Sequence, residues 1–186
     1  WYAMMCYWQN NSKSIALSVW NVTPKDVMGY EKAVEWNGLI GAFGFIVTFS
    51  IAFYLAKLAK KHGAKMIHFA CLLFGAISFL WFPTIQNQYV FFAVIIGYGI
   101  AWASMMGIPY LMVVAVIPKE RYGVYMGIIN MMIVIPMIIQ NLSFGYILKN
   151  FLDNDPRQAI SFAGVLLMLA AICTLLIKIK NTKVSE

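Results

Sequence analysis

The stretch PKERYGVYMGIINMMIVIPMIIQNLSFG, residues 118–145, places a charged turn directly before a long apolar run. That run contains four residues that are unusual in an apolar helix, namely Asn130, Pro136, Gln140 and Asn141. A helix that crosses the hydrocarbon core of a bilayer needs about 20 mostly apolar residues. Amides are costly there unless a protein group, a solute or water pairs with them. The stretch therefore predicts a membrane helix with one polar face.

The whole chain has the composition of a membrane protein. Its 186 residues are 62% hydrophobic and 11% charged, whereas a soluble domain has about 45–50% apolar and about 25% charged residues. The three cysteines fall in separate apolar runs, a spacing that favours buried free thiols over a disulfide framework or a metal site. We therefore expect no metal and no cofactor.

Four further segments have the length and hydropathy of a membrane helix. The five predicted spans, each bounded by charged or turn residues, are 37–56, 66–82, 89–117, 122–148 and 158–177. Ahead of them, residues 1–8 are predicted to be the end of a truncated sixth helix and residues 9–36 an outer loop. The spans are expected to occupy residues 37–180, with a tail at 181–186. No segment alternates as a strand does, so an all-α membrane protein is expected.

The charged residues lie in the connections, and they are distributed unevenly. Alternate connections on one side hold the whole formal net charge of +7, because basic and acidic residues are equal in number on the other side. The positive-inside rule makes the basic side cytoplasmic, with the C-terminus there. The composition, rich in lysine, isoleucine and asparagine, favours a bacterial source, so the expected location is the plasma membrane, the inner membrane of a bacterium. The residues expected to orient or gate this face are Lys60, Lys61, Gly63, Lys65, Lys119 and Arg121. Nucleic acid is not expected as a partner, because short loops between spans hold these cations.

The polar residues of the opening stretch form a stripe. At about 100° per residue, Asn130 and Asn141 fall on one helix face with Gly127, and Gln140 lies about 80° away at its edge. Either the stripe lines a hydrophilic cavity and binds a polar solute, or the amides bond neighbouring helices. Pro136 lacks a backbone donor and is expected to kink the helix.

The preceding span, residues 89–117, carries small residues at a regular spacing. Gly99, Ala103 and Gly107 recur every fourth residue, a pattern that permits close contact with another helix. Pro109 is a second candidate for a kink in this span. We expect these residues to act in helix packing.

Aromatic residues provide the other candidates for a binding site. Tyr98 and Trp102 lie on a different face of the same span, with Trp102 near its middle. Their rings either stack on the apolar face of a sugar or pack against other helices. Trp8 and Gln9 stand at the end of the first helix, and they belong either to the same site or to an interfacial helix end.

The stretch IPKERYGVYMGIINMMIVIP, residues 117–136, resembles the eleventh helix and preceding loop of sucrose- and maltose-type transporters. These glycoside–pentoside–hexuronide:cation symporters are members of the major facilitator superfamily. The matching positions are Pro118, Gly123, Met126, Gly127, Asn130, Ile133, Val134 and Pro136. Met137 stands where the family commonly has glutamine, so the resemblance implies that a sugar contact there is lost or moves to Gln140.

A second stretch, AKLAKKHGAK at residues 56–65, resembles the cytoplasmic loop motif of the superfamily. Gly63 and Lys65 match that motif, and Lys61 substitutes for its arginine. Lys60 replaces the motif's acid, so a latch based on that acid is not expected in this half.

The resemblance implies a fold and an activity. The fold is the C-terminal six-helix half of a twelve-helix carrier, its first helix truncated and its N-terminal half missing. The activity is uptake of a disaccharide or related glycoside, driven by a cation, with the proton expected. The resemblance implies that the coupling carboxylate belongs to the missing half, and the spans here hold none. The alternatives are a carrier for another small polar solute and a non-transporting pore or scaffold. An enzyme is not expected, because catalytic groups do not converge.

Overall fold

The protein is all-helical over residues 1–177, the part that the structure, a computed structural model, describes. The α-helices are α1 (Tyr2–Ile15), α2 (Val27–His62), α3 (Ala64–Trp81), α4 (Phe91–Val114), α5 (Tyr122–Phe151) and α6 (Pro156–Leu176). A π-helix (Ala16–Trp20) extends α1, and 3-10 turns (Phe82–Thr84 and Lys119–Arg121) follow α3 and precede α5. The predicted all-α class is confirmed.

Five of these helices, α2 to α6, are long and apolar enough to cross a membrane. Each of them overlaps one of the five predicted spans, so the prediction of a multi-pass membrane protein is confirmed. The side chain of Lys119 and the predicted tail at 181–186 lie outside the described residues.

Most of the predicted outer loop, residues 9–36, is helical. The π-helix continues α1 to Trp20, and only residues 21–26 separate it from α2. Asn21 ends the π-helix in the left-handed conformation, and the Asp26 carboxylate caps α2 by accepting a hydrogen bond from the Gly29 backbone N–H at 3.2 Å. The sequence analysis placed the helix ends close to the charged residues of the connections. Charged residues limit what can lie in lipid, but they do not end a helix.

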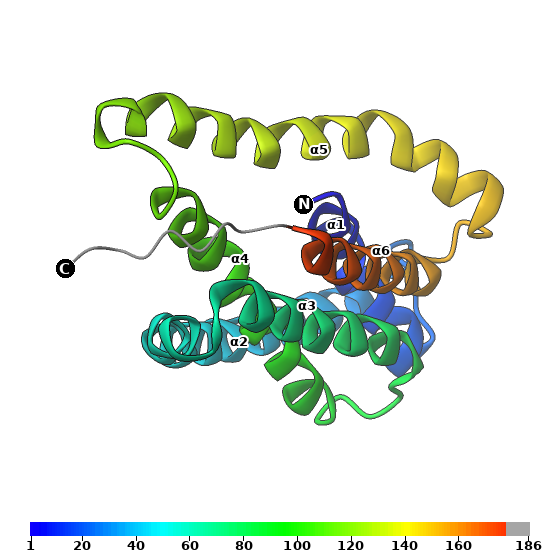
Figure 1. The fold of residues 1–186 in the computed structure, drawn as a ribbon. Helices are drawn as coiled ribbons and strands as arrows, with labels where there is room; N and C mark the ends of the chain where they lie inside the picture. The colour runs from blue at the N-terminus through cyan, green and yellow to red at the C-terminus, as the bar shows by residue number, and fades with distance from the viewer. Residues whose placement is uncertain (178–186) are drawn as a thin grey trace.

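The helices differ in how far the rest of the chain surrounds them. In Figure 1, α3 lies beside α6, α4 runs from the bottom of the bundle up to its connection with α5, and α5 stands apart above α1. The most apolar window of α4 is 61% buried, against 17% for α2 and 6% for α5. α4 is therefore the central helix, and α2 and α5 offer large apolar faces to their surroundings.

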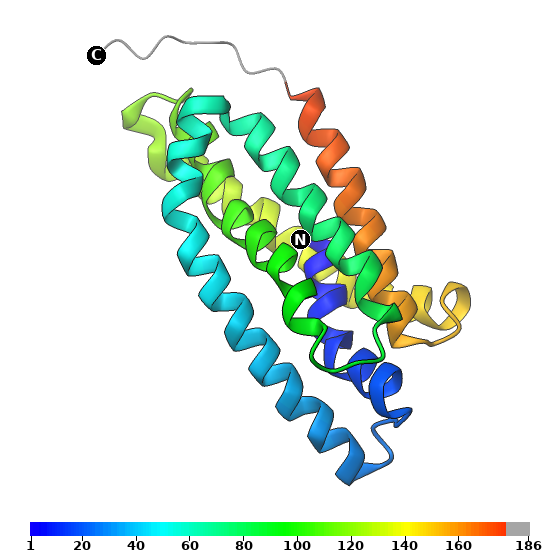
Figure 2. The same ribbon diagram turned by 90° about the horizontal axis from the view of Figure 1, so that it is seen from below.

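The predicted basic connections share one end of the bundle. Figure 2 shows the α2–α3 turn, the α4–α5 connection and the end of α6 together at that end, with the other connections opposite. Gly63 forms the α2–α3 turn with φ +88°, a conformation that glycine tolerates best. Lys65 Nζ donates hydrogen bonds to the carbonyls of Leu175 and Ile177, each at 3.1 Å. This lysine therefore ties the start of α3 to the end of α6.

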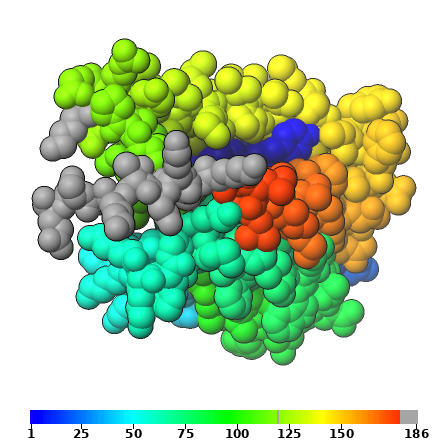
Figure 3. Space-filling model, viewed as in Figure 1, coloured from blue at the N-terminus to red at the C-terminus, as the bar shows by residue number. Residues whose placement is uncertain are grey.

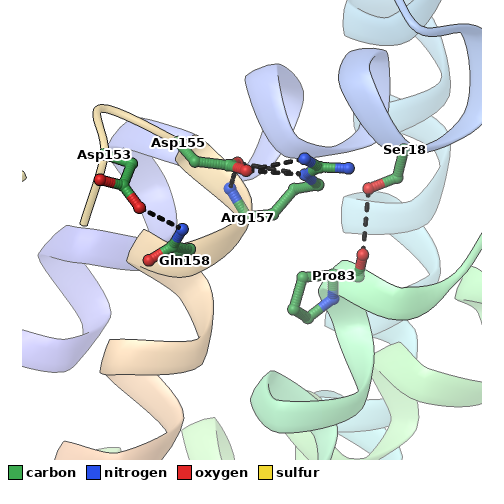
Figure 4. Close-up of polar contacts among 6 residues, drawn as sticks. All are labelled: Ser18, Pro83, Asp153, Asp155, Arg157 and Gln158. Atoms are coloured by element: carbon green, nitrogen blue, oxygen red, sulfur yellow. Dashed lines mark hydrogen bonds and ion pairs between the residues drawn. The ribbon is translucent and has the colours of Figure 1, made fainter.

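At the opposite end, polar contacts fix the turn between α5 and α6 (Figure 4). The Asp155 carboxylate accepts hydrogen bonds from the Arg157 backbone N–H at 2.8 Å and from the Arg157 guanidinium at 2.7 and 3.1 Å. Ser18 Oγ donates to the Pro83 carbonyl at 3.2 Å, which joins the π-helix to the end of α3. The first contacts fix the α5–α6 turn itself, and the Ser18 bond joins the extension of α1 to the α3–α4 connection.

The predicted small-residue face of α4 is used over only part of its length. A Cβ at Gly99 would lie 2.8 Å from the Gly44 carbonyl oxygen of α2, so α2 and α4 are in backbone contact there. At Gly107, and at Gly127 on α5, nothing lies within 4 Å of such a Cβ. α4 and α5 each continue as one α-helix through the internal prolines Pro109 and Pro136.

Candidate functional site

Three amide side chains from α1 and α5 form a continuous hydrogen-bonded cluster. Gln140 Nε2 donates to Gln9 Oε1 at 2.9 Å, and Gln9 Nε2 donates to Asn141 Oδ1 at 2.9 Å. Asn141 Nδ2 in turn donates to the Met137 carbonyl at 2.9 Å. Of the predicted binding residues, the structure thus brings Gln9, Gln140 and Asn141 together, and we call these three residues the amide cluster.

The amide cluster retains one acceptor without a partner. Gln140 is fully buried, and its Oε1 accepts no hydrogen bond from the described residues. A buried acceptor left unpaired costs about 1–3 kcal/mol. Water, or a hydroxyl group of a bound solute, would supply the missing donor.

The stripe of α5 that faces the bundle passes through Gln140 rather than through the two asparagines. The buried residues of α5 are Ile129, Gln140 and Phe144, at spacings of eleven and four that keep them on one helix face. Asn130 and Asn141 each follow a buried residue by one position, about 100° around the helix, and both are exposed in the chain alone. The prediction placed Gln140 at the edge; in the structure it lies at the centre.

Four aromatic residues from α1 and α4 form a second cluster. Tyr98 and Trp102 stack with ring centroids 6.2 Å apart and an interplanar angle of 6°. Trp8 and Trp1 each meet Trp102 edge-on, at 5.3 and 5.5 Å. Trp8 Nε1 also donates to the Tyr98 hydroxyl at 3.3 Å. We call Trp1, Trp8, Tyr98 and Trp102 the aromatic cluster.

The two clusters meet on α1, because Trp8 belongs to the aromatic cluster and its neighbour Gln9 to the amide cluster. Figure 3 shows α1 recessed between α5 and α6. Six of the seven predicted binding residues therefore lie around one stretch of α1. These six residues come from α1, α4 and α5.

The seventh predicted residue, Asn130, lies elsewhere. Its Oδ1 accepts a hydrogen bond from the Tyr110 hydroxyl at 2.9 Å, which joins α5 to α4. Ten residues of helix separate Asn130 from Gln140, a distance of about 15 Å along α5. Asn130 is thus a second contact point of α5 and is not part of the amide cluster.

The surroundings of both clusters are uncharged. Within residues 1–177, the hydrogen-bond partners of the amide cluster and of Trp8 and Tyr98 are all neutral, and the one ion pair, Asp155–Arg157, lies at the end of the bundle. Such a site offers amide donors and acceptors beside aromatic faces. It favours a neutral solute that has both hydroxyl groups and apolar surface.

The residues that sequence analysis missed are those that complete these contacts. Cys6 Sγ lies 3.8 Å from Gln140 Nε2, and the Tyr2 hydroxyl bonds Ser143 Oγ at 2.9 Å. Cys6 and Tyr2 precede Gln9 by three and seven residues, the spacing of one helix face. That periodicity is visible in the sequence, but the partner helix is not.

A cleft of about 400 Å³ lies at the end of the bundle that holds the Asp155–Arg157 pair. Its lining includes Lys13, Thr23, Asp153 and Asp155, and none of the predicted binding residues. It is therefore separate from the two clusters.

Five helices long and apolar enough to cross a membrane, with amide and aromatic side chains between them, define the class of the polytopic membrane protein. The family model of the Major Facilitator Superfamily matches residues 1–141, and the chain belongs to this superfamily of membrane transporters. No curated protein and no solved structure matches it. The members of the superfamily are transporters rather than enzymes.

Proposed function

We propose that this chain belongs to a secondary transporter that takes up a disaccharide or a related glycoside, coupled to protons, by alternating access. The observation that carries the proposal is the junction at Trp8 and Gln9, where the aromatic and amide clusters meet. A sugar has hydroxyl groups for the amides and apolar faces for the rings, and an uncharged site suits an uncharged solute.

The free acceptor on Gln140 supports this proposal. In the transporters that the sequence resembles, a glutamine commonly stands at the position of Met137. Here the Met137 carbonyl accepts a hydrogen bond from Asn141, and Gln140, about one turn further along α5, has the oxygen without a partner. We infer that Gln140 takes over the sugar contact in this protein.

The exposed faces of α2 and α5 support the proposal that a further helical half completes the carrier. The exposed apolar side chains include Phe45, Phe49 and Phe53 on α2, and Met131, Ile135 and Ile138 on α5. In carriers built from two halves, the solute site lies between them at the middle of the membrane. The described chain would then be the C-terminal half, with its basic end and C-terminus in the cytoplasm.

The test is uptake by the natural full-length protein in proteoliposomes. Trp102→Ala should raise the KM for sucrose or maltose about two- to tenfold, because an aromatic ring contact is worth about 0.5–1.5 kcal/mol. The matched control is Trp36→Ala, since Trp36 packs edge-on against Tyr89 and Phe92 away from both clusters. It should leave the KM unchanged.

Three results would decide against all or part of this function. Uptake that both Trp102→Ala and Gln140→Leu leave unaltered would assign the two clusters to helix packing alone. Flux that does not saturate with solute and shows no counterflow would identify a pore. Saturation with other polar solutes, but not with glycosides, would retain the carrier and reject the sugar.

A further inference from the structure

An imidazole lies near the basic end of the bundle, on the second turn of α3. The five predicted spans contain no Asp, Glu, Lys or Arg, but His68 falls within the second of them. In the structure its Nδ1 lies 2.7 Å from Ser104 Oγ, so α3 and α4 are hydrogen-bonded at this point. Ser104 is fully buried, ten residues before the end of α4. Ionisable side chains at such positions are rare and usually functional.

The surroundings of this pair do not compensate a charge. Cys71, one turn further along α3, packs with Leu55 of α2 and Ala103 of α4 in a small apolar cluster. No carboxylate among residues 1–177 hydrogen-bonds or forms an ion pair with His68. A neutral imidazole therefore fits this site, whereas an imidazolium would need water or a rearranged neighbour.

We propose that His68 is a proton-binding site of this protein, with the Ser104 hydroxyl as its hydrogen-bond partner. The proposal rests on the transport function proposed above. In the neutral form the Ser104 hydroxyl donates to Nδ1. In the protonated form Nδ1–H donates to Ser104 Oγ, and the hydroxyl hydrogen turns toward a backbone carbonyl of α4. The only bond formed is N–H, and the proton comes from water and returns to water.

The hydrogen bond between His68 and Ser104 can form whether the imidazole is neutral or protonated. The hydrogen bond persists in both, so α3 and α4 stay joined while the charge changes. The imidazolium is stabilised in a conformation that admits water to the α3–α4 contact, and the neutral ring in one that excludes it. The free energy of protonating His68 therefore differs between the two conformations, and this difference shifts the equilibrium between them.

The elements packed around His68 carry further titratable and charged groups at this end of the bundle. On α3 they are Cys71 and Lys65, whose ammonium group is bound to the α6 carbonyls. α4 contributes Ser104, which does not titrate, and α6 carries the exposed thiol of Cys173 at this end. The basic side chains on the last turns of α2 are exposed: Lys57, Lys60, Lys61 and His62.

The transport test compares His68→Asn with His62→Gln in the full-length protein. An asparagine amide can reach Ser104 from the position of Nδ1 but does not titrate, and His62 is an exposed control at the end of α2. We expect His68→Asn to lower proton-driven accumulation at least about fivefold and to flatten its pH profile, with solute counterflow retained. The His62→Gln protein should behave as the wild type. An unchanged pH profile in His68→Asn would overturn the proposal.

A second measurement does not depend on transport. Nitrogen NMR of ¹⁵N-histidine-labelled protein, compared with the spectrum of His68→Asn, identifies the signal of His68. We expect the ring to titrate between about pH 4 and pH 8, and Ser104→Ala to move the midpoint. A ring that keeps one protonation state over that range, or a midpoint that Ser104→Ala leaves in place, would overturn the proton site. If the wild type shows neither uptake nor counterflow, the transport function fails and this titration alone decides the proton site.

Discussion

Gln140 Nε2 lies 2.9 Å from Gln9 Oε1, and this hydrogen bond joins α5 to α1 where α5 has few other buried side chains. The same Gln9 side chain donates to Asn141, so one residue of α1 holds two consecutive residues of α5. In an apolar environment, helices associate through such polar contacts as well as through packing. The amide cluster therefore has a structural role in addition to the binding role proposed for it.

A double-mutant cycle with Gln9→Leu and Gln140→Leu should give a coupling free energy of about 1 kcal/mol, the usual scale for hydrogen bonds between membrane helices. The measurement is reversible unfolding in mixed micelles. The control pair is Gln9→Leu with Asn150→Leu, since Asn150 bonds only the Tyr146 carbonyl of its own helix. That pair should be additive, and a coupling of similar size in both cycles would refute a specific bond.

The contact of α2 with α4 predicts opposite effects for two glycines. An alanine Cβ at Gly99 would lie 2.8 Å from the Gly44 carbonyl oxygen and 2.9 Å from Val47 Cγ1, so Gly99→Ala should destabilise the protein by about 1–3 kcal/mol. Gly107→Ala meets nothing within 4 Å and should stabilise α4 by about 0.5–1 kcal/mol. Thermal unfolding in detergent measures both changes. Equal effects would show that the helices do not touch at Gly99.

The sequence predicts the spans well, because hydropathy and charge reflect the lipid environment directly. It predicts helix ends less well, since the first turns of α2 carry Glu31, Lys32 and Glu35 and are nevertheless helical. The membrane limits where those charges can lie, and the Asp26 cap determines where the helix begins.

The candidate site could be predicted as a set of residues, but not as a geometry. Six of the seven predicted binding residues gather around α1, which their polar or aromatic character in apolar helices already indicated. The position of Gln140 at the centre of the buried stripe depends on which face of α5 contacts α1. That contact is a property of the tertiary structure. The eleven-residue spacing from Ile129 to Gln140 is consistent with that face, but equally regular stripes exist elsewhere on α5.

The hydrogen bonds of Lys65 predict a stabilising effect at the basic end of the bundle. Its ammonium group neutralises the negative end of the α6 dipole through the Leu175 and Ile177 carbonyls. Lys65→Met should therefore destabilise the protein by about 0.5–1 kcal/mol. The exposed Lys61 is the control, and Lys61→Met should change the free energy of unfolding by less than about 0.5 kcal/mol. Equal losses of stability in both variants would mean that the charge of Lys65 stabilises the protein independently of these two hydrogen bonds.

The Asp155–Arg157 pair predicts acid sensitivity of the α5–α6 turn. Partial burial raises the pKa of the Asp155 carboxyl, but the hydrogen bonds from Arg157 outweigh it, and this pKa lies below its ordinary value. The ionised carboxylate is therefore favoured in the folded state. Its contribution is complete above the ordinary pKa of aspartate, about 3.9, and is lost as the pH falls through the lowered folded pKa.

Asp155→Asn should remove this part of the acid dependence, so that the free energies of unfolding of variant and wild type converge as the pH falls below about 4. Unfolding of both proteins in detergent, measured from about pH 7 to about pH 2, checks the convergence. Asp153→Asn is the matched control, because Asp153 accepts only a 3.4 Å hydrogen bond from Gln158. Its difference from the wild type should be smaller. If the pKa of Asp155 is lowered in the folded state, the difference in free energy of unfolding between Asp155→Asn and the wild type must shrink as the pH falls. Curves of free energy against pH that stay parallel would show that the pair does not contribute to folding.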